Sequence, residues 1–289
     1  MAWCRNPGRR VRILLRRRSS AGAYLTMLPA SVRARPGPPE RSKLALVIFW
    51  GSAAFLAPWI VFLFIEQAKT GTAHHLRWVN EGIALCLLAG MIVTAILAAR
   101  RSQQVLLSAA FCGTLAFITA WFGTVSAHGA AFWFLLFHAI FVLLPVCVLS
   151  FWVVSVTYDH RGGDPGLPSW VPAAYLVGAL IIVPLIVVGF IAVHPDRAVV
   201  HLRLLWTGLD CFELAMMIAT GVLVWRRSSA LAVTAMCLGT LMFADAWFNI
   251  FATTGAAAIA AIVMACGELP LSVYAVYAAH HEVHRWSRV

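Results

Sequence analysis

Four acidic residues lie inside long apolar stretches of the sequence, namely Asp210, Glu213, Asp245 and Glu268. On membrane-insertion scales, each would cost about 2.5–3.5 kcal/mol if it stayed ionised near the centre of a helix. Such carboxyl groups are therefore protonated, paired with a basic group, or turned toward a polar interior. Carboxylates in these surroundings can hold a cation, carry a proton or bind a polar substrate, so these four residues are the candidate site.

The composition places these acids in a membrane protein. Of the 289 residues, 62% are hydrophobic and 11% are charged, whereas a soluble domain has about 45–50% apolar and about 25% charged residues. This excludes an ordinary soluble enzyme, a disordered chain and a fibrous repeat. The sequence contains no nucleotide-binding, zinc-protease or serine-hydrolase motif. No cofactor is predicted, and a non-enzymatic protein is favoured over an enzyme.

The apolar residues gather into eight runs that are each long enough to cross about 30 Å of hydrocarbon as a helix. The predicted fold class is therefore an all-α, polytopic membrane protein with eight transmembrane helices. The runs are Leu44–Ile65, Val79–Ala99, Val105–Val125, Ala130–Val156, Val171–Val193, Leu204–Trp225, Ala230–Phe251 and Ala256–Ala279.

The basic residues predict the orientation of these helices. The formal net charge is +11, and 11 of the 22 Lys and Arg residues lie before residue 44. With the N-terminus inside and eight spans, 18 basic residues fall on the inner side and four on the outer side, as the positive-inside rule requires. We expect a multi-pass protein of the plasma (inner) membrane with both termini in the cytoplasm. The positive charge then reports topology, and no nucleic-acid partner is predicted.

The chain also resembles itself at an offset of 126 residues. Between 58–122 and 184–248, 26 of 65 positions are identical without a gap, where chance would give roughly five. Arg100-Arg101-Ser102 aligns with Arg226-Arg227-Ser228, and Ala120-Trp121-Phe122 aligns with Ala246-Trp247-Phe248. This predicts two four-helix repeats, and because four is an even number the two repeats run parallel.

The predicted organisation has five parts. A basic N-terminal arm, 1–43, lies on anionic lipid, and much of it would be absent if translation began at Met27. The first membrane repeat is 44–157, a cytoplasmic linker spans 158–170, the second repeat is 171–280, and a basic cytoplasmic tail covers 281–289. The predicted partner is the lipid bilayer, and the oligomeric state is left open.

The second repeat carries Trp206-Thr-Gly208-Leu-Asp210, then Arg226-Arg227, then Asp245-Ala246-Trp247-Phe248. In this pattern it resembles a group of uncharacterised multi-pass membrane proteins of high-GC Gram-positive bacteria. The resemblance covers mainly 184–270 and implies the architecture without implying a reaction. Asn249 stands where that group usually has a second Asp, which counts against a paired-metal site.

The four acids are expected in the outer half of the membrane. Asp210 and Asp245 each lie about six residues, or roughly 9 Å, from the outer ends of their helices. Glu213 is one turn deeper, and Glu268 is near the midplane. The alignment places no acid at the matching positions of the first repeat, so the scaffold does not require them. The predicted supporting residues are Thr207, Arg203, His201 and Ser272.

Three functions remain open at this stage. The first is a transporter for a small solute or a cation, in which the acids hold the cation or a proton. The second is a non-transporting scaffold, assembly partner or sensor, in which the acids bond helices together. The third is an intramembrane enzyme with the acids as metal ligands, although the sequence offers no ligand spacing that would identify the metal.

Overall fold

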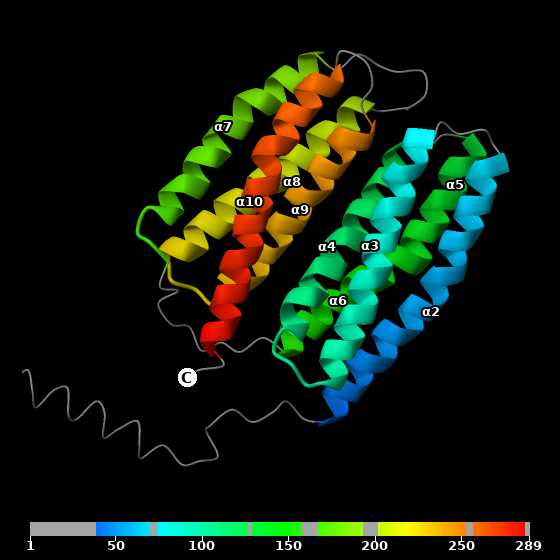
Figure 1. The fold of residues 1–289 in the computed structure, drawn as a ribbon, viewed down its shortest axis with the longest axis horizontal. Coiled ribbons are helices and arrows are strands. Elements are labelled where there is room, and N and C mark those ends of the chain that lie inside the picture. Colours follow the sequence, from blue (N-terminus) through cyan, green and yellow to red (C-terminus); the bar gives the residue numbers. More distant parts are fainter. Residues whose placement is uncertain are drawn as a thin grey trace, which may run out of the picture. The chain divides into compact units, whose positions relative to one another are not determined.

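The computed structural model describes residues 39–69, 74–126, 129–157, 167–192, 202–252 and 257–286 (Figure 1). These residues form helices joined by turns, and no strand occurs among them. The helices are α2 (Pro39–Lys69), α3 (His74–Ala99), α4 (Val105–Ser126), α5 (Gly129–His138), the π-helical turn η2 (Ala139–Leu143), α6 (Leu144–Thr157), α7 (Val171–Ala192), α8 (Leu202–Trp225), α9 (Leu231–Ala252) and α10 (Ala257–Trp286).

Seven of the described helical segments are long and apolar enough to cross a bilayer, with α5, η2 and α6 counted as one segment. The all-helical class is confirmed for these residues, and the seven segments are consistent with a polytopic membrane protein. The eighth predicted span, α7, offers only a shorter described apolar stretch, Val171–Pro184. The N-terminal arm before residue 39 and most of the linker, 158–166, lie outside the described residues.

Three helices extend five or more residues beyond the apolar runs that predict them, namely α2, α10 and α3, which begins at His74 instead of Val79. Helix α2 begins at Pro39 instead of Leu44, because proline suits the first turn of a helix, where its missing N–H is not needed. Helix α10 continues past Ala279 to Trp286. His284 and Arg285 lie in its last turn, where positive charge interacts favourably with the helix dipole.

The fourth apolar run is one helix with a π-helical turn in its middle. Pro145 has no N–H, and its ring would clash with the carbonyl group one turn earlier. The chain widens before it, and the Leu144 N–H donates to the Ala139 carbonyl, five residues back. The run therefore stays helical from Gly129 to Thr157 while it changes its winding at the proline.

The two Arg-Ser turns have the same geometry. Arg101 and Arg227 adopt φ values of 53° and 52°, in the left-handed region that usually favours glycine. After each of them a serine N–H closes the preceding helix, from Ser102 to Leu97 and from Ser228 to Leu223, both at 2.9 Å. This is the hydrogen-bond pattern of a Schellman cap. It joins α3 to α4 and α8 to α9 in the same way.

The centre of the described bundle is built on two glycine–tryptophan contacts. Helix α9 packs against α4 and α3, and α4 also packs against α8 (Figure 1). The Trp247 ring of α9 covers Gly82 of α3, and the Trp121 ring of α4 covers Gly208 of α8. Between them the Phe122 and Phe248 rings stack with centroids 3.6 Å apart. The sequence alignment pairs Gly82 with Gly208, Trp121 with Trp247, and Phe122 with Phe248, so the two glycine–tryptophan contacts correspond to each other.

These contacts predict that a single methyl group at either glycine destabilises the bundle. In Gly82→Ala or Gly208→Ala the new Cβ would overlap the tryptophan ring, and overpacking of this kind costs about 1–3 kcal/mol. The unfolding of purified full-length protein in detergent would measure the loss. Gly51→Ala is the matched control, because its new methyl meets nothing within 4 Å. Equal stability of all three variants would contradict the prediction.

Candidate functional site

Three of the four intramembrane acids come together between two helices. Helix α8 supplies Asp210 and Glu213, which lie one turn apart on the same face, and α9 supplies Asp245. One carboxylate oxygen from each residue can be chosen so that all three atoms lie within 4.8 Å of one another. We call these three residues the acidic cluster. It forms because α8 and α9 pack side by side and carry their acids at matching depths.

The fourth acid, Glu268 of α10, is linked to the cluster through Asn249. The Asn249 side-chain Nδ2 donates to Asp245 Oδ2 at 3.4 Å, and it lies 3.4 Å and 3.3 Å from the two oxygens of Glu268. The carboxyl groups of Asp245 and Glu268 also share a hydrogen bond. A hydrogen bond between two carboxyl groups needs a proton on one of them.

Asn249 is the residue that the sequence analysis missed. It was considered only as a departure from a second Asp, although its spacing of four residues from Asp245 puts both side chains on one face of α9. That spacing was the signal that could have identified it. In the structure the carboxamide is buried and ties two helices together, because it can donate to carboxylates on both of them.

Two residues of the acidic cluster are almost completely buried, so ionising their carboxyl groups costs free energy. The exposed fraction is 1% for Asp245 and 3% for Glu213. Asp245 Oδ1 and Glu213 Oε1 have no hydrogen-bond partner among the described residues. Two ionised carboxylates at 4.8 Å repel by about 3.5 kcal/mol with an effective dielectric constant of about 20. The cluster therefore needs a proton or a cation to be stable, and its two unpartnered oxygens are available to accept one.

The first half of the bundle provides an internal comparison. The positions that align with Asp210 and Glu213 are Ala84 and Leu87, and both are buried apolar residues. Near the position that corresponds to Glu268 lie Val142 and Leu143, which are also apolar. The position that aligns with Asp245 is Thr119, whose hydroxyl donates within its own helix to the Leu115 carbonyl at 2.8 Å. The first half therefore packs without acids at these aligned positions, and its described buried acid, Glu81 of α3, lies elsewhere.

The predicted supporting residues differ in what the structure describes. Ser272 is buried and donates to the Gly239 carbonyl at 2.7 Å, which is a packing bond between α10 and α9. Thr207 is partly exposed, near the start of α8. The backbone of Arg203 lies in α8, but its side chain is outside the described part of the chain, and so is the whole of His201.

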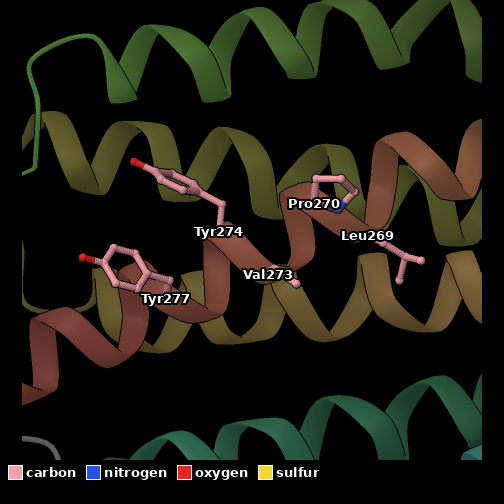
Figure 2. Close-up of a pocket in the computed structure, with 5 residues that line it drawn as sticks. All are labelled: Leu269, Pro270, Val273, Tyr274 and Tyr277. Atoms are coloured by element: carbon pink, nitrogen blue, oxygen red, sulfur yellow. The ribbon is translucent and has the colours of Figure 1, made fainter.

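An open apolar groove runs along α10 beside the fourth acid. It has a volume of about 620 Å³ and is lined by Leu269, Pro270, Val273, Tyr274 and Tyr277. Figure 2 shows these side chains on successive turns of α10, with both tyrosine hydroxyl groups toward the same end. Leu269, the first residue that lines this groove, follows Glu268 directly in the sequence. In a bilayer a surface of this composition suits lipid chains.

The link through Asn249 leads to a stability prediction. Asn249→Leu keeps the approximate volume but removes the donor to Asp245 and Glu268, leaving buried acceptors without it, which costs about 1–3 kcal/mol. Unfolding of the purified protein in detergent measures the effect. Ile250→Ala is the neighbouring control, because Ile250 is 41% exposed and its truncation should change stability by less than about 0.5 kcal/mol. If Asn249→Leu is as stable as the control, the hydrogen bonds from Asn249 do not contribute to the free energy of unfolding.

Comparisons with known proteins give no further guide to this site. The chain matches no protein-family model, and comparisons with curated proteins and with solved structures also found no match. The resemblance to multi-pass membrane proteins of high-GC Gram-positive bacteria therefore stays a prediction from the residues that carry it. Function has to be argued from the geometry of the acids.

Proposed function

We propose that the protein is an integral membrane transporter for a small solute or a cation. In this proposal Asp210, Glu213, Asp245 and Glu268 hold the cation, or the proton, that moves across the membrane. The observation that carries the proposal is the convergence of buried carboxyl groups from α8, α9 and α10, with unpartnered oxygens on Asp245 and Glu213. Intramembrane acids that face one another are typical of ion and proton pathways.

The apolar counterparts in the first half of the bundle support a functional role over a structural one. If the acids served only to join helices, the corresponding positions of α3, α4 and η2 would need a substitute for them. Those positions hold Ala84, Leu87, Thr119 and Leu143, which pack without any polar bond between helices. Keeping four carboxyl groups in the other half costs folding energy, and ion binding is a reason to keep them.

The proposed architecture is eight transmembrane helices in two parallel four-helix repeats, in the plasma membrane with both termini in the cytoplasm. The matching Arg-Ser caps and the paired Gly82–Trp247 and Gly208–Trp121 contacts support this arrangement. The basic turns would then face the cytoplasm, as the positive-inside rule favours. The acidic cluster would lie in the outer half of the membrane.

The uneven burial of the four acids fits a site that opens on one side at a time. Asp245 and Glu213 are closed off from solvent, whereas Asp210 and Glu268 are partly exposed. A transported ion would enter past the partly exposed pair and be released after α8, α9 and α10 rearrange. Alternating access of this kind is the usual behaviour of transporters built from helical repeats.

Flux measurements on reconstituted full-length protein test the proposal. Proton uptake would be followed with an entrapped pH dye under an imposed potential, and Mn²⁺ and Ca²⁺ uptake with an entrapped metal dye. The wild-type protein should raise at least one flux above that of empty liposomes. Asp245→Asn and Glu213→Gln keep the side-chain shape but remove the charge, so they should reduce that flux by at least about tenfold.

Glu282→Gln is the matched control. Glu282 is also a buried acid of α10, paired with Arg285 at 3.8 Å, but it lies about 21 Å along the helix from Glu268. This variant should transport normally. If wild-type protein carries none of the probes, the transport proposal is wrong. If the Asp245 and Glu213 variants are degraded before insertion, the acids serve the fold and the structural alternative is supported.

A further inference from the structure

The donor atoms of the acidic cluster distinguish between classes of ion. Asp210, Glu213 and Asp245 offer only carboxylate oxygens. Hard cations such as Ca²⁺, Mg²⁺ and Mn²⁺ prefer oxygen ligands, whereas Zn²⁺ and Cu²⁺ sites are built mainly from histidine and cysteine. A hard cation is therefore the class that these three side chains suit.

The spacing of the oxygens fits one ion held between the two helices. Oxygens on opposite sides of a Ca²⁺ ion, at 2.3–2.6 Å from it, are about 4.6–5.2 Å apart. The three oxygens of the cluster lie within 4.8 Å of one another, so an ion at their centre is at most about 2.8 Å from each, and small side-chain adjustments bring them to the Ca²⁺–oxygen distance. Mg²⁺ dehydrates reluctantly and demands near-ideal octahedral geometry, so a site of three buried carboxylates suits it less than Ca²⁺.

Charge balance selects a divalent ion over a monovalent one. Three ionised carboxylates in an apolar region would keep two uncompensated charges beside a monovalent ion, but only one beside a divalent ion. Glu268 accepts from Asn249, which favours its ionised form, and a fourth negative charge beside the cluster would favour a divalent ion further. The lower residual charge costs less in a medium of low dielectric constant.

The unpartnered oxygens are the second and independent observation. Glu213 Oε1 and Asp245 Oδ1 have no hydrogen-bond partner among the described residues. The two residues that carry them are only 3% and 1% exposed. Both side chains contribute to the same cluster, and buried acceptors without partners are uncommon because each loses its interactions with water. An ion between the helices would satisfy both atoms together.

We infer that the acidic cluster binds one hard divalent cation of about the size of Ca²⁺ or Mn²⁺, coordinated by Asp210, Glu213 and Asp245, with Glu268 and Asn249 beside it. This inference rests on the proposed function and names the ion of that site. Asn249 acts as a positioning residue, because it holds Glu268 against the carboxylate of Asp245 and leaves Asp245 Oδ1 for the ion.

Mn²⁺ binding to purified full-length protein in detergent tests the inference directly. The loss of the free-ion electron paramagnetic resonance signal should report about one equivalent of bound Mn²⁺, which Ca²⁺ displaces and excess K⁺ does not. Asp245→Asn and Glu213→Gln should weaken binding by at least about tenfold. Glu282→Gln should bind as the wild type does. Mn²⁺ should also raise the unfolding temperature of the wild type and the Glu282 variant, because a ligand stabilises the state that binds it.

The outcomes separate this inference from the proposed function. A wild type that takes up no Mn²⁺, or only Mn²⁺ that Ca²⁺ cannot displace, overturns the inference; so does full binding by both cluster variants. If those two variants do not fold, Asp210→Asn decides instead, because its partly exposed side chain can be replaced with less effect on packing. Proton flux without Mn²⁺ binding would leave the transporter standing with a different ion. Mn²⁺ binding without any flux would keep the ion site and exclude transport.

Discussion

The central helices of this protein depend on close approach at two glycines. Gly82 and Gly208 let the rings of Trp247 and Trp121 lie directly against the α3 and α8 backbones. In a bilayer, where lipid is as apolar as the side chains, such close packing is a main source of helix association. The contacts also lie two residues from the site, since Gly208 precedes Asp210 and Trp247 follows Asp245. The same packing that holds the halves of the bundle together therefore sets where α8 and α9 present their acids.

Much of the fold could be predicted from the sequence, because hydrophobic length and charge act locally. The apolar runs locate the helices, and the Arg-Ser turns mark their ends. The differences have local physical causes that a hydropathy pattern does not contain. Pro145 inserts a π-helical turn without ending its helix, and the proline at position 39 starts α2 early. Helix α10 extends to Trp286 through polar residues, since Glu282 is buried and paired with Arg285.

For the candidate site, the depth of each acid could be predicted from the sequence, but the contacts between the side chains could not. Depth along each helix is a matter of counting residues, and counting placed Asp210 and Asp245 at similar levels. Which side chains then touch depends on how each helix is rotated about its axis, and the sequence does not state this. In the structure that rotation brings Asn249 to the acids and the Ser272 hydroxyl to the Gly239 carbonyl of α9. The residue types in the apolar runs pointed to a carboxylate site, whereas the packing of the helices determines which side chains belong to it.

The asymmetry between the two halves bears on how such a site could open. All four acids belong to α8, α9 and α10, so an ion held there would be released only when these helices separate. Helix α8 is also attached to α4, where Trp121 Nε1 donates to the Leu205 carbonyl at 3.3 Å and its ring packs edge-on against Phe212. A movement of α8 away from α9 has to carry α4 with it or break this attachment. Under the proposed function, the half of the bundle that lacks the acidic cluster is the support against which the other half moves, which gives that half a role although the cluster belongs to the other.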